Sequence, residues 1–255
     1  MRYALALLLA LAVTARADNE TDTEDLKAQE DPTILRRRVW LDQEWNHYKD
    51  NSNNIEETLG GVWSWRISAK QEWAIRLKVP LEVQVAGGSP GDRDLWGLGD
   101  IKLGTGTAFK LSDTWRAGFG LEMRFPSATG DDLGDDVWRL QEMPAIAWDV
   151  TSWLTLSPSA EINQSVAREH GGSPQNYIEI FFPATFILPD NWSVTPRYEA
   201  KVNFEDDNRW SSSGKLTIAK QLDKVPVGFA LSIKRTFDGG DKEFQINFVT
   251  TYFFR

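Results

Sequence analysis

Polar and apolar residues alternate along most of the chain, in segments of about a dozen residues that turn residues separate. A repeat of two residues predicts β-strands with one polar and one apolar face. In the segment 192–204 every second residue is apolar, and the residues between them are Ser193, Thr195, Arg197, Glu199, Lys201 and Asn203. Alternation of this length matches a tilted strand that crosses a membrane, which needs about 9–11 residues.

Twelve such segments can be counted in the sequence. They lie near residues 34–47, 54–67, 72–86, 98–110, 113–125, 137–149, 153–167, 177–188, 191–204, 209–221, 225–237 and 242–254. An even number of antiparallel strands places both ends of the chain on one side of a membrane, which is the periplasmic side in bacterial outer-membrane barrels.

The connections between these segments alternate in length. The short ones lie at 68–71, 111–112, 150–152, 189–190 and 222–224. The longer ones, rich in Gly, Asp, Asn and Ser, lie at 86–97, 126–136, 168–176, 205–208 and 238–241. Short periplasmic turns and longer outer loops are typical of outer-membrane barrels. The sequence therefore predicts an all-β fold: a transmembrane, antiparallel up-and-down β-barrel of twelve strands, whose closure leaves no strand edge unpaired.

Aromatic residues gather at the ends of the predicted strands. The tryptophans beside short turns are Trp65, Trp73, Trp115, Trp148, Trp153 and Trp192. The aromatic residues beside long loops are Trp45, Trp138, Trp210, Phe125, Phe204 and Phe237. Two belts of amphipathic rings are expected where a barrel meets the two membrane surfaces.

One segment fits the alternation poorly. Strict alternation through 137–149 places Glu142 on the lipid-facing side. A β-bulge near Met143-Pro144 would turn this carboxylate inward, and without such a bulge the predicted bounds of this segment are wrong.

The N-terminus has the pattern of a secretory signal peptide: a basic start, an apolar run at 4–13 and Ala15-Arg16-Ala17. The apolar run is shorter than the ~20 residues of a membrane-spanning helix, so we expect residues 1–17 to be removed. Residues 18–32 are acidic, and we interpret them as a flexible periplasmic leader, with a short plug helix within Glu24 to Glu30 as the alternative. Residues 33–255 are then the barrel.

The charge of the mature chain argues against nucleic acid as a partner. The sequence has 28 basic and 37 acidic residues, and loss of Arg2 and Arg16 with the signal leaves 26 basic ones and a net charge of −11. Nucleic-acid binding depends on Lys and Arg that neutralise phosphates. The chain has no cysteine, which excludes disulfides and thiol chemistry.

Alternation points charged side chains of both signs into the barrel. Those we predict to line a pore are Arg76, Lys78, Glu82, Asp100, Lys102, Arg116, Glu122, Arg124, Arg197, Glu199 and Lys201. One interpretation is a wet path for polar solutes with a weak anion preference. The other is a salt-bridged filling that holds the barrel rigid, because twelve strands lie between filled barrels of about eight and open ones of sixteen or more.

The predicted outer loops are acidic. Their carboxylates are Asp92, Asp94, Asp131, Asp132, Asp135, Asp136, Asp206, Asp207, Asp238 and Asp241. Such groups suit Ca²⁺ or Mg²⁺ bridging to lipopolysaccharide, although solvated loops are the simpler interpretation. The sequence contains no spacing of a metal site or cofactor motif, so we predict neither.

The histidines offer little for an enzyme. His47 and His170 both lie near predicted outer loops. A lipolytic barrel pairs a lipid-facing His with a nearby Ser. His47 has that orientation, but Ser52 lies in a loop and Ser211–Ser213 cannot be placed beside it from sequence. With no G-x-S-x-G motif either, we predict no catalytic residues and no enzymatic activity.

Three motifs carry a family resemblance: Gly97-Leu-Gly-Asp-Ile101, Phe125-Pro-Ser-Ala-Thr-Gly130 with Leu133-Gly134, and Asp207-Asn-Arg-Trp210. From about residue 97 onward the chain resembles the outer-membrane barrels grouped as "MetA-pathway of phenol degradation" transporter-like proteins. The resemblance implies a channel or transporter for small organic compounds. The chain departs from the family's pattern at Ser211-Ser212-Ser213, where an apolar-Pro step is common, and at Arg255, which follows the expected insertion signal Phe254.

These features predict an exported outer-membrane channel for passive uptake or efflux of small solutes, with aromatic or anionic compounds as candidates. Its expected partners are outer-membrane lipid and lipopolysaccharide, the solute, and the barrel-insertion machinery. The alternatives are a closed structural or adhesive barrel that acts through its acidic loops, and an outer-membrane lipase.

Overall fold

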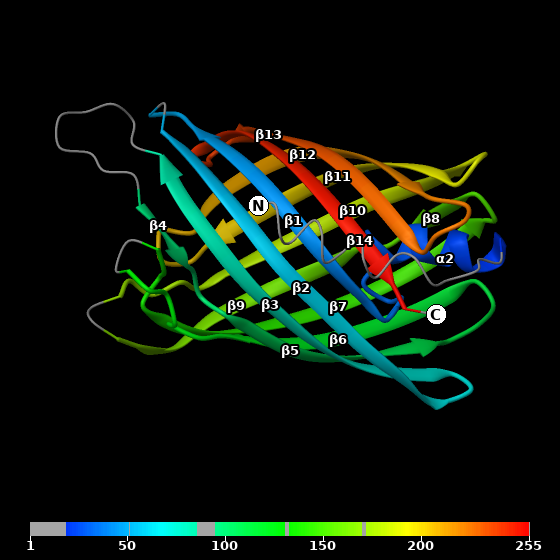
Figure 1. Ribbon diagram of the computed structural model, residues 1–255. Coiled ribbons are helices and arrows are strands. Elements are labelled where there is room, and N and C mark those ends of the chain that lie inside the picture. The colour runs from blue at the N-terminus through cyan, green and yellow to red at the C-terminus, as the bar shows by residue number, and fades with distance from the viewer. Residues whose placement is uncertain (1–18, 51, 86–94, 131–132, 170–171, 255) are drawn as a thin grey trace.

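The protein is a closed antiparallel β-barrel with twelve strand positions (Figure 1). The computed structural model describes residues 19–50, 52–85, 95–130, 133–169 and 172–254. The strands are β1 (Arg38–Tyr48), β2 (Asn53–Ser68), β3 (Gln71–Val85), β4 (Leu95–Leu98), β5 (Lys102–Lys110), β6 (Trp115–Arg124), β7 (Val137–Thr151), β8 (Leu154–Leu156), β9 (Ser159–Arg168), β10 (Tyr177–Leu188), β11 (Trp192–Asn203), β12 (Arg209–Gln221), β13 (Val227–Asp238) and β14 (Lys242–Phe253). The predicted barrel is thus confirmed.

Two positions in the wall are divided between two short strands. β4 pairs with β3 beyond the end of β5, and β8 and β9 follow one another between β7 and β10. The barrel closes where β1 pairs with β14, with Arg38 opposite Phe253 and Trp45 opposite Ile246. The strand ends agree with the sequence to within four residues, and the largest differences are at the starts of β1 and β5. β1 begins at Arg38 rather than near residue 34, and β5 begins at Lys102 rather than near residue 98.

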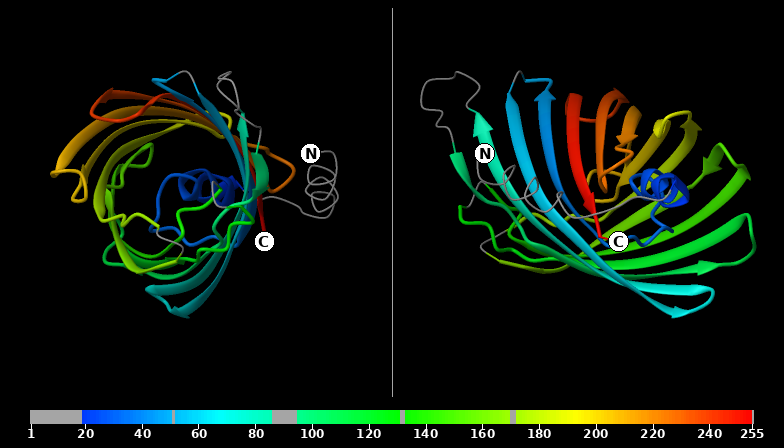
Figure 2. Two further views of the ribbon diagram at one scale, coloured as in Figure 1. Left: turned by 90° about the vertical axis from the view of Figure 1, so that its left-hand side faces the viewer. Right: turned by 45° about the vertical axis from the view of Figure 1, so that its right-hand side comes forward.

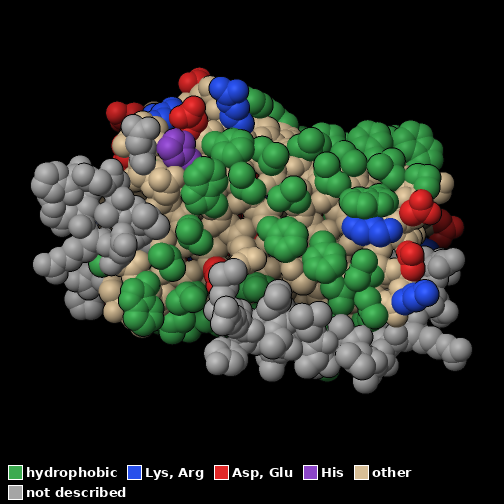
Figure 3. All heavy atoms as spheres, turned by 45° about the horizontal axis from the view of Figure 1, so that its top comes forward, with side chains coloured by type: hydrophobic (Ala, Val, Ile, Leu, Met, Phe, Trp, Pro, Cys, Tyr) green, Lys and Arg blue, Asp and Glu red, His purple; other side chains and the backbone are tan. Residues whose placement is uncertain are grey.

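The outward face is apolar and the inward face is polar, as the alternation predicts. Exposed hydrophobic side chains such as Leu59, Trp63 and Ile75 share one parity, and buried polar ones such as Thr58 and Ser64 share the other. Hydrophobic side chains cover the middle of the surface in Figure 3, whereas charged ones lie mainly toward its two ends. This distribution suits a wall in contact with lipid.

The two ends of the barrel differ in the length of their connections. We call the end with the short connections, such as 111–114 and 189–191, the turn end, and the opposite end the loop end. Trp115 and Trp148 stack at the turn end with ring centroids 5.3 Å apart, and Phe125 meets Trp138 edge to face at the loop end. Aromatic pairs therefore mark both rims of the apolar wall.

The prediction of a β-bulge near Met143-Pro144 is wrong. β6 and β7 pair without interruption, with Leu121 opposite Glu142 and Phe119 opposite Pro144, so Glu142 stays on the outward face. Pro144 lies where the β7–β9 ladder has no pair, so its missing N–H costs no ladder hydrogen bond and needs no bulge.

The segment that we expect to be a flexible leader, 18–32, is described from residue 19 onward, and these residues lie in the lumen. Helix α2 (Asn19–Ala28) lies inside the ring of strands near the turn end, as Figure 2 shows. Leu26 packs on Ala219 and Ala230 of the barrel wall, which matches the plug-helix alternative. The predicted signal peptide, residues 1–17, lies outside the described residues. Among the described helices none has the length and apolar content to span a membrane.

Candidate functional site in the lumen

Residues 19–37, here called the plug segment, occupy the lumen at the turn end (Figure 2). The segment consists of α2 and the chain that leads from it into β1. Asp25, Leu26 and Ala28 are almost completely buried. The helix does not dock through a broad apolar face, because Leu26 is its main apolar contact with the wall. Ion pairs join Lys27, Glu30 and Asp31 to the wall.

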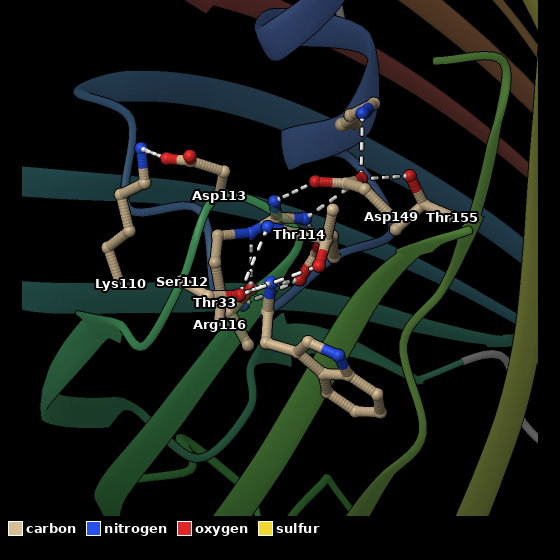
Figure 4. Close-up of polar contacts among 11 residues, drawn as sticks. Thr33, Lys110, Ser112, Asp113, Thr114, Arg116, Asp149 and Thr155 are labelled. Atoms are coloured by element: carbon tan, nitrogen blue, oxygen red, sulfur yellow. Dashed lines mark hydrogen bonds and ion pairs between the residues drawn. The ribbon is translucent and has the colours of Figure 1, made fainter. Parts of the chain in front are cut away.

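Arg116 of β6 is the main ionic attachment of the plug segment (Figure 4). Its guanidinium pairs with Asp31 at 2.8 Å, forms a short ion pair with Asp149 of β7, and donates a hydrogen bond of 3.2 Å to the Thr33 hydroxyl. Asp149 also accepts from Lys27 at 2.9 Å, so one wall carboxylate joins a wall cation to a helix cation. Arg116, which we predicted to face the lumen, thus contacts the plug segment.

Glu30 attaches the plug to the opposite wall. Its carboxylate accepts a hydrogen bond of 2.9 Å from the Thr217 hydroxyl and lies 3.4 Å from Arg197 and 3.8 Å from Lys215. Burial raises the pKa of the Glu30 carboxyl, but the combined effect of the two cations and the hydroxyl lowers it by more. The pKa of Glu30 therefore lies below its ordinary value. The docked plug therefore favours the ionised carboxylate.

Glu122 holds a second cluster in the wall of β3, β5 and β6. Its carboxylate lies 2.7 Å from Arg76 and 3.4 Å from Lys78, both on β3. These residues are two strands apart, and Gly104 of β5 lies between Arg76 and Glu122 in register. A Cβ on Gly104 would lie 3.3 Å from Glu122 Cβ, so glycine leaves room for this contact across β5.

Asp100 differs from its predicted role in a pore lining. It lies between β4 and β5, its side chain is buried, and it pairs with Arg124 at 3.0 Å. It also accepts hydrogen bonds from the backbone N–H groups of Ser127, Ala128 and Asp135. Asp100 therefore fixes the loop after β6 against the end of β4, which brings together two of the motifs on which the family resemblance rests.

Most of the other predicted lining residues form rows in register. Lys78, Lys102, Arg124 and Arg139 lie side by side on β3, β5, β6 and β7. Glu44, Glu56 and Glu82 do the same on β1, β2 and β3. The inner wall thus has a basic row on β3 to β7 and an acidic row on β1 to β3, and the two rows share β3, where Lys78 and Glu82 both lie.

Arg197, Glu199 and Lys201 lie on β11 and have different partners. Glu199 forms short ion pairs with Arg197 and Lys234 and accepts a hydrogen bond of 3.0 Å from Ser213. The Lys201 ammonium lies 3.8 Å above the centre of the Tyr177 ring. Sequence alternation placed these residues inside, but it gave no information about which of them pair.

The lumen contains a cavity at each end. The turn-end cavity, about 390 Å³, lies between the plug segment and β2–β7 and has Arg66, Lys70 and Arg116 in its lining. A smaller space of about 100 Å³ continues along the small residues Gly106, Gly118 and Gly120. The loop-end cavity, about 400 Å³, lies against β10–β14. These cavities are the spaces in which a solute could bind or pass.

Catalytic and metal-binding arrangements receive no support from the described residues. His47 Nδ1 lies 3.0 Å from the Asn53 side-chain oxygen, and the ring stacks on Trp45. Within the described ranges, no group of three or more His, Asp or Glu side chains is arranged to hold a metal ion. His170 and the loop aspartates Asp92, Asp94, Asp131 and Asp132 lie outside those ranges.

The fold resembles that of known outer-membrane channels. The COG4313 outer membrane channel from Pseudomonas putida F1 aligns with a TM-score of 0.72 at 12% identity, over 88% of this chain and 99% of that one. The NanC porin aligns at 0.58 with 14% identity, and the KdgM porin at 0.54 with 8%, each over 86% of this chain and 99% of the other. No family model matches the sequence, and no curated protein does either. The likeness establishes an outer-membrane β-barrel fold.

Proposed function

We propose that this protein is an outer-membrane channel for small polar solutes, with the turn end in the periplasm. The observation that carries the proposal is the charged, hydroxyl-rich inner wall with a cavity at each end. A wall built only for rigidity has no need of spaces of 390 and 400 Å³ at its two ends. The resemblance of the loop motifs to the MetA-pathway family supports a transport role for small organic compounds.

The residues proposed to line the path are those of the basic and acidic rows, together with Arg76, Arg197 and Lys201. The basic row supports an anion preference, because a ring or row of cations lowers the energy of an anion in a narrow pore. The plug segment lies across the turn end of this path, so passage there follows the cavity between the plug and β2–β7.

A closed structural barrel is the second candidate, and the docked plug segment is the observation that favours it. A solute-uptake assay separates the two. Liposomes that carry the purified mature chain are placed in isosmotic solutions of solutes of increasing size, and swelling is followed by light scattering. The channel predicts swelling that decreases with solute size. Swelling no faster than that of protein-free liposomes, with folded barrel in the membrane, would favour the closed barrel.

A further inference from the structure

The loop-end cavity has the size and chemistry of a small-molecule site. Its volume, about 400 Å³, falls in the range of known ligand pockets, about 300–1,000 Å³. Four cations, four carboxylates and several hydroxyl groups line it. They are Lys201, Arg209, Lys234 and Lys242, then Glu179, Glu199, Asp206 and Asp241, with hydroxyls such as those of Ser211 and Ser213. Apolar side chains are few in this lining, so an apolar solute would gain little from it.

Most of the cavity's cations already have a carboxylate partner. Lys234 forms a short ion pair with Glu199 and lies 3.9 Å from Glu179. Lys242 lies 3.4 Å from Glu44, and Arg209 lies 3.3 Å from Asp206. Each of these charges is compensated within the protein, so none of them requires a ligand.

Lys201 is different. It has no salt bridge with any residue in the described part of the chain, and its ammonium lies over the Tyr177 ring instead. Glu179 is directly opposite Lys201 in the β10–β11 register and attracts it, but the salt bridge of that carboxylate is with Lys234, at 3.9 Å. An ammonium has three N–H donors, and the Tyr177 ring contacts the Lys201 ammonium from one side only. The half-buried Lys201 can therefore still donate hydrogen bonds to an anion.

The serine run adds donors and acceptors beside this cation. Ser211 lies opposite Lys201 in the β11–β12 register, and Ser213 lies opposite Glu199. The Ser213 hydroxyl donates to Glu199, whereas the Ser211 hydroxyl has no hydrogen bond to a described residue.

We propose that the loop-end cavity binds small hydroxylated carboxylates, such as sugar acids and hydroxy acids, with Lys201 as the counter-ion of the carboxylate and Ser211 as a hydrogen-bond partner of a hydroxyl. The proposal rests on the channel function and names its solute class. A neutral sugar would leave Lys201 uncompensated, and an aromatic acid would leave the hydroxyl groups without partners.

Isothermal titration calorimetry on the folded mature chain in detergent tests the proposal with D-gluconate as the probe. D-glucose and benzoate are the comparison ligands, since each lacks one of the two required features. We expect saturable binding of gluconate and at least tenfold weaker binding of the other two. Lys201→Gln should weaken gluconate binding by roughly tenfold or more, the worth of a charge-assisted hydrogen bond, and Lys201→Arg should retain it.

Lys220→Gln is the matched control. Lys220 lies at the turn end over Trp192, far along β12 from the cavity, so this variant should bind gluconate like the wild type. If Lys201→Gln fails to fold, Ser211→Ala replaces it, with an expected loss of severalfold. Equal binding of gluconate and glucose, an unchanged affinity in Lys201→Gln, or the absence of saturable gluconate binding by folded wild type would overturn the proposal.

Binding in detergent does not require an open pore, so the two proposals fail separately. Gluconate binding by a protein that passes no current would support this site and contradict the channel. A conducting channel without gluconate binding would contradict this site alone.

Discussion

Charged side chains in the lumen form ion pairs, and the sequence alone does not predict which residues pair with each other. Alternation predicts that Arg76 and Glu122 face inward, and both do. Their contact depends on Gly104 between them, which is a property of strand order and register rather than of local sequence. Arg116 shows the same limit, because its partner Asp31 lies in a segment outside the barrel wall.

Arg116→Gln should release the plug segment. The change leaves the buried Asp31 carboxylate without a cation, and loss of one partner of a buried pair costs about 3–5 kcal/mol. Hydrogen–deuterium exchange should therefore become faster at residues 25–33 and remain slow in the barrel strands. Lys110→Gln removes only the exposed pair with Asp113 and should leave exchange unchanged. Unchanged protection of the plug in Arg116→Gln would contradict its role as the main attachment.

Glu142→Leu should stabilise the barrel. Glu142 lies on the outward face opposite Leu121, where a carboxylate in contact with lipid is unfavourable. We expect the free energy of unfolding to rise by roughly 1–2 kcal/mol in denaturant titrations in lipid vesicles. Glu122→Leu is the contrasting variant and should lower it, since Arg76 and Lys78 lose their partner. A less stable Glu142→Leu protein would show that this carboxylate has a partner in the membrane.

Acid should loosen the plug through Glu30. The pKa of Glu30 is lower in the docked plug than in a free chain, so docking is strengthened where the carboxyl is ionised. This contribution is complete above the ordinary pKa of a glutamate, about 4.3, and is lost as the pH falls through the lowered value. Exchange at residues 25–33, corrected for intrinsic rate, should rise on acidification. Glu30→Gln should show faster exchange at neutral pH and a smaller response to acid, and an identical response in both proteins would exclude Glu30 as the sensor.

At the scale of elements, the strands were predictable and the plug segment was not. Period-two alternation is a strong signal, and it placed nearly every strand within a few residues. Residues 19–28 carry little apolar periodicity, because Leu26 supplies the apolar contact of the helix with the wall. The other contacts are ionic: Lys27 pairs with Asp149 of the wall, and Asp25 pairs with Arg36 of the plug segment. Such a segment has the composition of a flexible leader, and the charged side chains that the barrel brings together, such as Arg116 and Asp149, help to fix its place.

A disulfide between Thr33→Cys and Gly118→Cys should lock the plug. A Cβ on Gly118 would lie 3.5 Å from Thr33 Cγ2 and 3.6 Å from Thr33 Cα, so the two positions approach closely enough for engineered cysteines to meet. The chain has no other cysteine. In a planar bilayer the oxidised protein should show a small, steady conductance that rises when reductant is added, because the plug then regains its motion. Gly118→Cys alone should not respond, and equal currents in the oxidised and reduced double variant would mean that the plug does not limit passage.

For the whole molecule, the sequence predicted the architecture well and the state of the lumen poorly. Strand number, inward and outward faces and the aromatic rims follow from patterns that membrane and water impose on every strand. Whether twelve strands enclose a path depends on how the plug and the ion pairs fill the space between walls. The plug segment occupies part of the turn end, but cavities of about 390 and 400 Å³ remain at the two ends, and we therefore propose a narrow channel.

Single-channel recording of the mature chain in a planar bilayer tests that conclusion most directly. A narrow channel with a basic row on β3–β7 predicts discrete current steps and a reversal potential that shows anion selectivity in a salt gradient. Lys102→Gln should shift that potential toward zero. A silent bilayer, with the inserted protein shown to be folded, would contradict the channel and identify the lumen as packed shut.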